Sequence, residues 1–338
     1  MTMNLENLEK MVAGLPNFRK TQAYDAIFKS GYDSWEKATN FSYLLRKAFE
    51  EKMPLSIDHE LFHSKDGKTT RALMKLSDGK HIETVLIRSG KRNSVCVSTQ
   101  LGCPMGCAFC ASGKDGFTRN LTVSEMVEQI LLFSRILKKE DEKVSNIVFM
   151  GMGEPFLNYK NVIETIRFLN NKSTLGLATR RFSISTSGVL SGIKKLSMEE
   201  NMEVNLAISL HSAIDKKRDT IMPVNKKFPL SKLAEALSDY YEKTSRKIMI
   251  EYVLIKDFNI SDEDAVALRK FINELDAAYV VNIIPLNETS CGYEAPTSFE
   301  IGKFKSYLEK YKINFVQRFS SGGDINAACG QLVRREKG

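Results

Sequence analysis

Helical spacing of apolar residues marks the first part of the chain, up to about residue 54. Apolar side chains recur every three or four positions among polar ones, at Leu5, Leu8, Val12 and Leu15. Pro16 and Gly31 interrupt this pattern, and a further helix is predicted over Tyr43–Lys52, before Pro54. We therefore expect a small helical accessory domain over residues 1–54.

The pattern changes over residues 55–90 to one that is typical of strands. Two runs, Thr70–Leu76 and His81–Ile87, flank Asp78-Gly79, a dipeptide that favours a hairpin turn. We expect these residues to form a β connector between the helical domain and the rest of the chain.

From residue 91 to residue 338, short apolar runs alternate with longer amphipathic ones. The predicted strands are Ser94–Thr99, Ser145–Met150, Phe182–Thr186, Val204–Leu210, Ile248–Ile255, Tyr279–Ile284 and Ile313–Val316. The predicted helices between them are Thr122–Lys138, Lys160–Asn170, Leu190–Ser197, Leu230–Thr244, Asp262–Leu275 and Ser298–Tyr311. This alternation predicts an α/β fold with a parallel sheet, closed into a partial or full barrel. Active sites of such barrels lie at the C-terminal ends of the strands.

Composition places the chain among ordinary globular proteins, since 43% of its 338 residues are hydrophobic and 27% are charged. No apolar run reaches the ~18 residues of a membrane-spanning helix. The first 14 residues lack the basic start and apolar stretch of a secretory signal. We therefore expect a cytosolic protein with no membrane partner. The 49 basic and 41 acidic residues give a net charge of +8, compatible with an RNA partner or with a solvated basic surface.

Four of the six cysteines fall within fifteen residues, which favours metal binding over disulfides in a reducing compartment. Cys103, Cys107 and Cys110 follow the first predicted barrel strand, with three and then two residues between them. Three such thiolates can hold three irons of a 4Fe–4S cluster and leave the fourth iron open. The alternatives are a zinc site, although the four histidines show no zinc-finger spacing, and buried thiols with no metal.

The cysteine loop, with Phe109 before its last cysteine, resembles the signature of the radical S-adenosylmethionine (SAM) superfamily. Further segments narrow the resemblance to the RlmN/Cfr RNA methyltransferases, over about residues 5–332. These segments include Ile82-Glu83-Thr84-Val85, Gly151-Met152-Gly153-Glu154-Pro155, Ser185-Thr186-Ser187-Gly188, Ser209-Leu210-His211 and Asp324-Ile325-Asn326-Ala327-Ala328-Cys329. The resemblance implies a partial (βα)6 barrel related to the TIM barrel, a 4Fe–4S cluster and SAM as cofactors, and an electron donor such as flavodoxin or ferredoxin.

The resemblance also implies a set of SAM contacts near the ends of successive strands. Taken singly, each of these residues could instead cap a helix or shape a turn, and Glu154 could be a capping glutamate in a tight βα turn. The expected SAM contacts are Gly153, Glu154, Ser185, Ser209, Leu210, His211 and Asn287.

Three more residues receive catalytic roles from the resemblance. Cys329 is the expected methyl carrier, and Cys96 is its resolving partner; each could otherwise be a small buried residue. Glu83 resembles the proton acceptor of the family, and its alternative is an exposed glutamate on a strand. Whether Glu83 or Cys96 takes the proton stays open. Cys291 has no family counterpart, so we expect a structural or surface thiol.

The expected substrate is one adenine of 23S ribosomal RNA, methylated at C2, with transfer RNA as a further candidate. The alternatives are C8 methylation of the same adenine, a radical SAM enzyme with a non-RNA substrate, and a zinc-containing RNA-binding protein. We expect a monomer. Candidate RNA contacts, each equally explained as a solvated face, are Arg180 with Arg181, Lys216 with Lys217 and Arg218, Lys226 with Lys227, and Arg334 with Arg335.

Overall fold

A single ten-stranded sheet organises the computed structural model, which describes residues 4–114, 116–287, 291–318 and 321–332. Its order is β1-β2-β3-β4-β7-β8-β9-β10-β11-β12. The strands are β1 (His59–His63), β2 (Thr69–Lys75), β3 (His81–Ser89), β4 (Arg92–Cys96), β7 (Asn146–Phe149), β8 (Phe182–Thr186), β9 (Asn205–Ser209), β10 (Ile248–Leu254), β11 (Tyr279–Pro285) and β12 (Phe315–Gln317).

The seven strands from β4 to β12 are parallel and correspond to the seven predicted barrel strands. The strands β1, β2 and β3 run antiparallel and extend the same sheet, because β3 pairs with β4 from Val85↔Cys96 to Ser89↔Arg92. The Asp78-Gly79 hairpin joins β2 and β3 as predicted. Strand β1 was not predicted, since its sequence, His-Glu-Leu-Phe-His, does not alternate.

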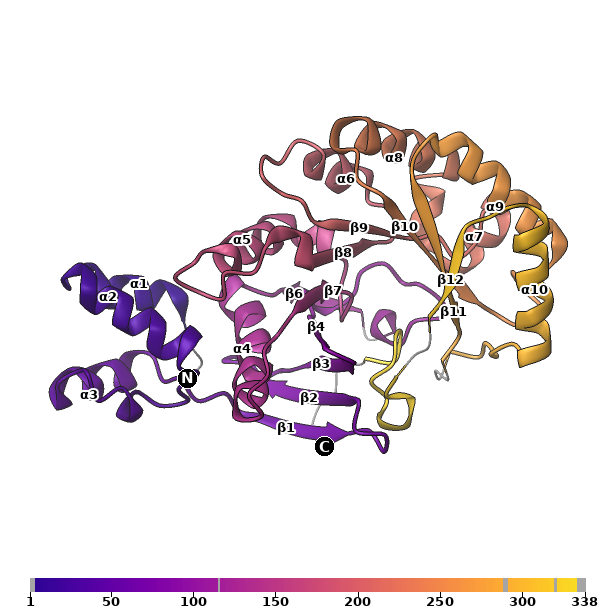
Figure 1. Ribbon diagram of the computed structural model, residues 1–338. Helices are drawn as coiled ribbons and strands as arrows, with labels where there is room; N and C mark the ends of the chain where they lie inside the picture. The colour runs from indigo at the N-terminus through magenta and orange to yellow at the C-terminus, as the bar shows by residue number, and fades with distance from the viewer. Residues whose placement is uncertain (1–3, 115, 288–290, 319–320, 333–338) are drawn as a thin grey trace.

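Helices cover the convex face of the curved sheet (Figure 1). They are α4 (Val123–Lys139), α5 (Tyr159–Asn170), α6 (Leu190–Leu196), α7 (Asp215–Ile221), α8 (Leu230–Thr244), α9 (Asp262–Leu275) and α10 (Ser298–Lys310). Capping boxes start α4, α9 and α10, so their first turns are fixed by local sequence. The short α7 was not predicted, because its seven residues are almost all polar and give no apolar stripe. The result is the partial barrel that the alternating pattern predicts.

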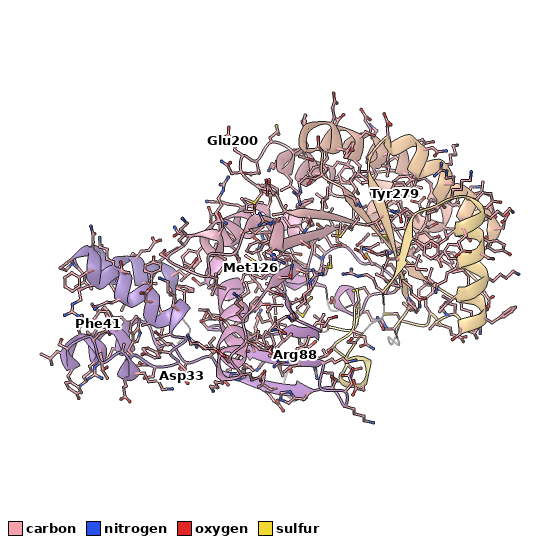
Figure 2. The ribbon with its side chains drawn as sticks, viewed as in Figure 1. Asp33, Phe41, Arg88, Met126, Glu200 and Tyr279 are labelled. Atoms are coloured by element: carbon pink, nitrogen blue, oxygen red, sulfur yellow. The ribbon has the colours of Figure 1, made fainter. Side chains whose placement is uncertain are left out.

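The N-terminal helices pack beside the barrel, at the left of Figure 1. They are α1 (Leu5–Ala13), α2 (Asn17–Tyr24), which continues as a π-helical turn over Asp25–Lys29, and α3 (Tyr43–Lys52). Trp35 is fully buried, and the rings of Phe41 and Phe49 pack against it. Figure 2 labels Phe41.

This helical module contacts the outer helices of the barrel. The ring of Phe28 lies 5.4 Å from that of Phe168 in α5, and the Leu5 amide donates to the Ser124 hydroxyl of α4 at 3.1 Å. Its buried side chains belong to the same apolar core as those of the barrel. Among the described residues, no helix is both long and apolar enough to cross a bilayer.

Candidate active site at the C-terminal ends of the parallel strands

A small hairpin frames the cysteine loop. Strands β5 (Gln100–Gly102) and β6 (Phe117–Asn120) pair antiparallel on either side of it, and the Cys103 amide donates to the Gly116 carbonyl at 2.9 Å. Gly102 has a φ of +78°, and a Cβ atom there would lie 1.9 Å from the Gly116 oxygen. Only glycine fits this closure. The hairpin therefore holds the three-cysteine loop just beyond the end of β4.

The thiols of Cys103, Cys107 and Cys110 are half-buried and free. Burial raises the pKa of Cys103 to about 12 and also raises the pKa of Cys110, whose neighbours include Cys291. Among the residues that the structure describes, no three acidic, histidine or cysteine side chains converge on one point as a single ion requires. A 4Fe–4S cluster does not require this, because each thiolate binds a different iron. The three soft donors on one framed loop therefore fit such a cluster.

Glu154 follows β7 and is buried among hydrogen-bond donors. Its Oε2 accepts from the amide and the hydroxyl of Ser187, both at 2.8 Å, and its Oε1 accepts from the Phe156 amide at 3.0 Å. Burial raises the pKa of this carboxyl, while the hydrogen bonds act in the opposite direction. Glu154 thus has the capping geometry that was the alternative explanation of this motif. Gly153, at φ +101°, passes so close to Gln100 that a Cβ would lie 2.6 Å from it.

Ser185 and Ser209 lie on neighbouring strands, with their Oγ atoms 3.4 Å apart. Leu210 is fully buried, and its amide donates to the carbonyl of Glu251 at 3.0 Å. Polar groups of these strand ends therefore meet on one side of the barrel mouth.

His211 is a buried, neutral side chain. Its Nδ1 accepts from the Val253 amide at 3.1 Å, which leaves the proton on Nε2. Burial lowers its pKa to about 3, and the charge of Arg218 lowers it further. Its ring meets the edge of the Phe109 ring, with centroids 4.9 Å apart. His211 thus connects the cysteine loop to β10.

Arg218 is buried rather than on a solvated face, so its prediction as an RNA contact was wrong. Its guanidinium donates to the carbonyls of Ser187, Ser209 and Leu210 at 2.8, 3.2 and 3.1 Å. Arg218 therefore links the backbone just after β8 to the backbone at the end of β9. Lys217, beside it, binds Asp264 at 2.8 Å. Arg334 and Arg335 lie outside the described residues.

Cys96 and Cys329 lie close enough for their charges to interact, although 233 positions separate them in the chain. Burial, and then the charge of Cys329, raise the pKa of Cys96 to about 12. Burial among protein atoms, followed by Cys110 and Glu251, raises the pKa of Cys329 to about 11. Cys96 is buried at the end of β4, whereas Cys329 is an exposed residue whose thiol is nevertheless surrounded by protein atoms.

The C-terminal segment that carries Cys329 is held mainly by the cysteine loop. The Ala111 amide donates to the Gly330 carbonyl at 2.8 Å, and the Ser112 hydroxyl donates to the Leu332 carbonyl at 2.6 Å. Asn287 donates to the Cys329 carbonyl at 3.0 Å. Figure 1 shows this segment, in yellow, between β3 and β11.

Glu83 lies fully buried in β3, so the alternative of an exposed glutamate was wrong. Its carboxylate forms an ion pair with Arg71 of β2, and its carbonyl accepts from the Ser98 hydroxyl at 2.6 Å. The guanidinium of Arg71 also lies 4.2 Å from the centre of the Phe62 ring. Next to Glu83, Thr84 donates to the Cys96 carbonyl at 2.8 Å. Glu83 therefore faces the interior on the strand beside Cys96.

Sequence reasoning missed a polar group inside the barrel, formed by Glu251, Asn282 and Arg318. Glu251 Oε1 accepts from Asn282 at 2.8 Å, and Arg318 lies 3.3 Å from Oε2. The charge of Arg318 lowers the pKa of both Cys96 and Cys329, while that of Glu251 raises the pKa of Cys329. A single acid within the apolar run of β10 was the signal that could have revealed this group.

Comparison with known proteins agrees with this geometry. The model of the radical SAM superfamily matches residues 97–269. A probable dual-specificity RNA methyltransferase RlmN from Pseudothermotoga lettingae is 44% identical, over 94% of this chain and 92% of the relative. One from Thermosipho melanesiensis is 42% identical, over 96% and 94%.

Among solved structures, a radical SAM methyltransferase from Sphaerobacter thermophilus superposes with a TM-score of 0.92 and 36% identity, covering 98% of this chain and 97% of that one. The fold, the cysteine loop and these full-length matches agree with one another. The chain belongs to the radical SAM superfamily, with a 4Fe–4S cluster and SAM as its cofactors, and within it to the RlmN family of RNA methyltransferases.

Proposed function

We propose that this enzyme methylates C2 of one adenine in 23S ribosomal RNA, with transfer RNA as a further substrate, through a methylated Cys329. The observation that carries the proposal is the pairing of an accessible Cys329 with a buried Cys96 beside the three-cysteine loop. A radical SAM enzyme that acts on a peptide or metabolite needs the loop but not this second pair of thiols.

The site residues divide into two groups in this proposal. Cys103, Cys107 and Cys110 hold three irons of the cluster, because they are the framed thiols. The residues that would hold SAM lie at the ends of β7, β8, β9 and β11: Gly153, Glu154, Ser185, Ser209, Leu210, His211 and Asn287. When bound, the cluster and SAM would supply the radical chemistry that removes a hydrogen atom from a methyl group.

The chain's own residues then explain why radical chemistry leads to a methylated base. Adenine C2 is electrophilic, so it does not attack the methyl group of SAM as a nucleophile would. A methyl group on the Cys329 sulfur, after loss of one hydrogen atom, can add to this carbon and join the base to the protein. The adduct is a radical, so it must lose the C2 proton and give one electron back to the one-electron redox partner before it becomes a stable thioether. Attack of the Cys96 thiolate on the Cys329 sulfur then breaks the bond between that sulfur and the methylene carbon. The carbon takes up a proton and leaves as the new methyl group of the RNA, with a Cys96–Cys329 disulfide left on the protein. A dithiol reductant that supplies two electrons then restores the thiols, whereas the flavodoxin- or ferredoxin-type partner supplies single electrons for the radical chemistry.

Glu83 and Cys96 are the two candidates for removing the C2 proton. Glu83 lies on β3 beside Cys96, and its carboxylate forms a buried ion pair with Arg71. Cys96 is the thiol that the proposal already uses to attack the Cys329 sulfur. We therefore favour Glu83 as the base and Cys96 as the resolving nucleophile.

Mass spectrometry of RNA tests the reaction and its position. Ribosomal and transfer RNA from cells with and without the gene are digested to nucleosides, with 2-methyl- and 8-methyladenosine resolved by standards. We expect 2-methyladenosine only in the presence of the enzyme. The appearance of 8-methyladenosine instead would show C8 specificity, and no change in either nucleoside would refute RNA methylation.

A Cys96→Ala variant tests the two thiols. It should methylate Cys329 and add to the base, then stall as a protein–RNA thioether that survives excess thiol and disappears on ribonuclease treatment. The matched control is Cys291→Ala, which removes a half-buried thiol without a proposed role and should turn over normally. The crosslink should be absent from Cys96→Ala/Cys329→Ala. Normal turnover of Cys96→Ala would contradict its resolving role.

We also propose that the helical module of residues 1–54 contacts RNA. Phe18 and Tyr43 are 57% and 68% exposed on its helices, where they could stack on unpaired bases. Deleting the module would expose the core that it shares with the barrel, so the sharper test is Phe18→Ser/Tyr43→Ser. This variant should bind RNA roughly tenfold or more weakly, at about 1–3 kcal/mol per stacked base. Unchanged binding would refute the contact.

A further inference from the structure

A pocket of about 750 Å³ opens at the end of the barrel opposite to the cysteines. It lies where four adjacent parallel strands begin. Arg92 is the first residue of β4, Asn146 is the first of β7, Arg181 directly precedes β8, and Asn205 is the first of β9. None of the proposed catalytic, cluster or SAM residues lines it.

Five cations and no carboxylate line this pocket, which we call the basic pocket: Lys91, Arg92, Lys143, Arg180 and Arg181. All five are exposed. Within the described residues, no salt bridge joins any of them to an acid. Glu140 and Glu142, which lie near Lys143 in the chain, bind Arg88 instead, and Figure 2 labels this arginine. The positive charge of the pocket is therefore not neutralised by the protein.

Polar contacts fix the backbone of this pocket before any ligand arrives. Asn205 donates to the carbonyl of Arg180 at 3.0 Å, and Asn146 donates to that of Arg181 at 3.4 Å. Arg246, just before β10, in turn donates to Asn205 Oδ1 at 3.0 Å. Partial burial lowers the pKa of Arg92, and the charges of Arg318 and Arg181 lower it further. Arg92 and Arg181 are thus held close enough to repel each other, and an anion between them would relieve this repulsion.

A second surface pocket lacks the uniform positive charge of the basic pocket. It measures about 240 Å³, and its lysines Lys194, Lys232 and Lys243 are interspersed with Glu235 and Asp239. Mixed charges of this kind offer no net attraction to a polyanion. By contrast, the basic pocket is open, large and of one sign, which suits several phosphates in succession rather than a single enclosed anion.

We propose that the basic pocket binds backbone phosphates of the RNA substrate, in a segment distinct from the one that presents the target base. This proposal rests on the proposed function, in which RNA is the substrate, and adds a second site at which the enzyme contacts that RNA. At about 3.3 Å per residue, the seven residues of β10 separate the two ends of the barrel by roughly 20 Å. The second contact therefore selects RNA that is large enough to reach around the barrel rim.

The test is salt-dependent binding of a full-length 23S ribosomal RNA transcript to the holoenzyme. The variant is Lys91→Gln/Arg180→Gln/Arg181→Gln, and the matched control, Lys194→Gln/Lys232→Gln/Lys243→Gln, removes the same charge from the second pocket. Each lost phosphate contact should reduce the slope of log affinity against log salt by about 0.7–0.9. We expect a decrease of about 2 to 3 for the variant, at least tenfold weaker binding at 0.1 M salt, and the wild-type slope for the control.

A charge-preserving variant, Arg180→Lys/Arg181→Lys, keeps the test independent of folding and should retain most of the wild-type slope. An unchanged slope in the triple variant would overturn the proposal, as would an equal decrease in the control. Inorganic tripolyphosphate serves as a second probe. If the triple variant lost its binding while RNA binding kept the wild-type slope, the pocket would serve a small polyanion and not RNA. Failure of the proposed function is a separate result, namely absence of methyladenosine with the wild-type enzyme.

Discussion

Removing the carboxylate of Glu83 should destabilise the fold strongly, whatever the role of this residue in catalysis. The side chains of Arg71 and Glu83 are 3% and 0% exposed, so Glu83→Ala leaves a guanidinium buried without its counter-charge. Breaking one side of such a pair costs about 3–5 kcal/mol. The Phe62 ring lies 4.2 Å from the guanidinium, and this contact stabilises the cation by about 2 kcal/mol. Because the contact is already present in the wild type, it does not reduce the cost of losing the carboxylate.

Urea unfolding followed by far-ultraviolet circular dichroism measures this effect. Fluorescence of Trp35, the single tryptophan, reports only the helical module and serves as a comparison. With a slope of about 3 kcal/mol per molar urea, the midpoint should fall by about 1 M or more. The double variant Arg71→Met/Glu83→Leu removes both charges at similar volume and should recover most of the loss.

A Glu83→Ala midpoint within about 0.3 M of the wild type would refute this reasoning, because the pair would then contribute little. The same result for the double variant as for the single one would show that packing, not charge, is responsible. Glu83→Gln separates stability from catalysis, since the amide can still accept a hydrogen bond from Arg71. Glu83→Gln should therefore lose less stability than Glu83→Ala, and, if Glu83 is the base, methylation by the folded fraction should fall by about 10²–10⁴.

Three further predictions follow from the site. Replacing Cys103, Cys107 and Cys110 together with alanine should remove iron and sulfide, measured chemically, and stoichiometric iron in this variant would contradict the cluster assignment. Gly322→Ala should displace the segment that carries Cys329, because Gly322 has a φ of +80° and an added Cβ would lie 2.6 Å from Thr69. Methylation of Cys329 should therefore fall while the iron content stays unchanged. The control is Gly323→Ala, since no atom lies within 4 Å of a Cβ at that position. Arg318→Gln should raise the pKa of Cys329 above about 11, since the cation that stabilises its thiolate is lost. Alkylation of Cys329, followed by peptide mass spectrometry, should therefore slow at pH 8–9 relative to that of Cys291, and an unchanged rate would contradict the influence of Arg318.

The alternating pattern was sufficient to predict the barrel because its strands are buried on both faces. All seven parallel strands and six of their helices, from α4 to α10 without α7, follow the predicted order with small shifts of their ends. Strand β1 and helix α7 escaped prediction because their residues are mostly polar. Strand β1 is instead fixed by its pairing with β2, and α7 is held by Arg218, which donates to the carbonyl of Ser187 at a separation of 31 positions.

The site was predictable only where spacing or family motifs carry information. The cysteine loop has a spacing that is visible in the chain, whereas the closeness of Cys96 and Cys329 depends on how the C-terminal segment folds back. Whether a charged side chain is buried was the least predictable property. Glu83 and Arg218 were both given exposed alternatives, yet each lies inside with partners distant in the chain or on another element.

The attachments of the Cys329 segment have a consequence for the order of events during synthesis. Lys65 donates to Asp324 across 259 positions, and Ser112 donates to Leu332 across 220. The residues proposed to hold the cluster and SAM leave the ribosome earlier, and domains form from the N-terminus onward. Cys329 can reach its position only after nearly the whole chain has emerged, because the segments that hold it are made long before it. On the proposed roles, a chain that ends before Cys329 therefore lacks the thiol that would become joined to RNA.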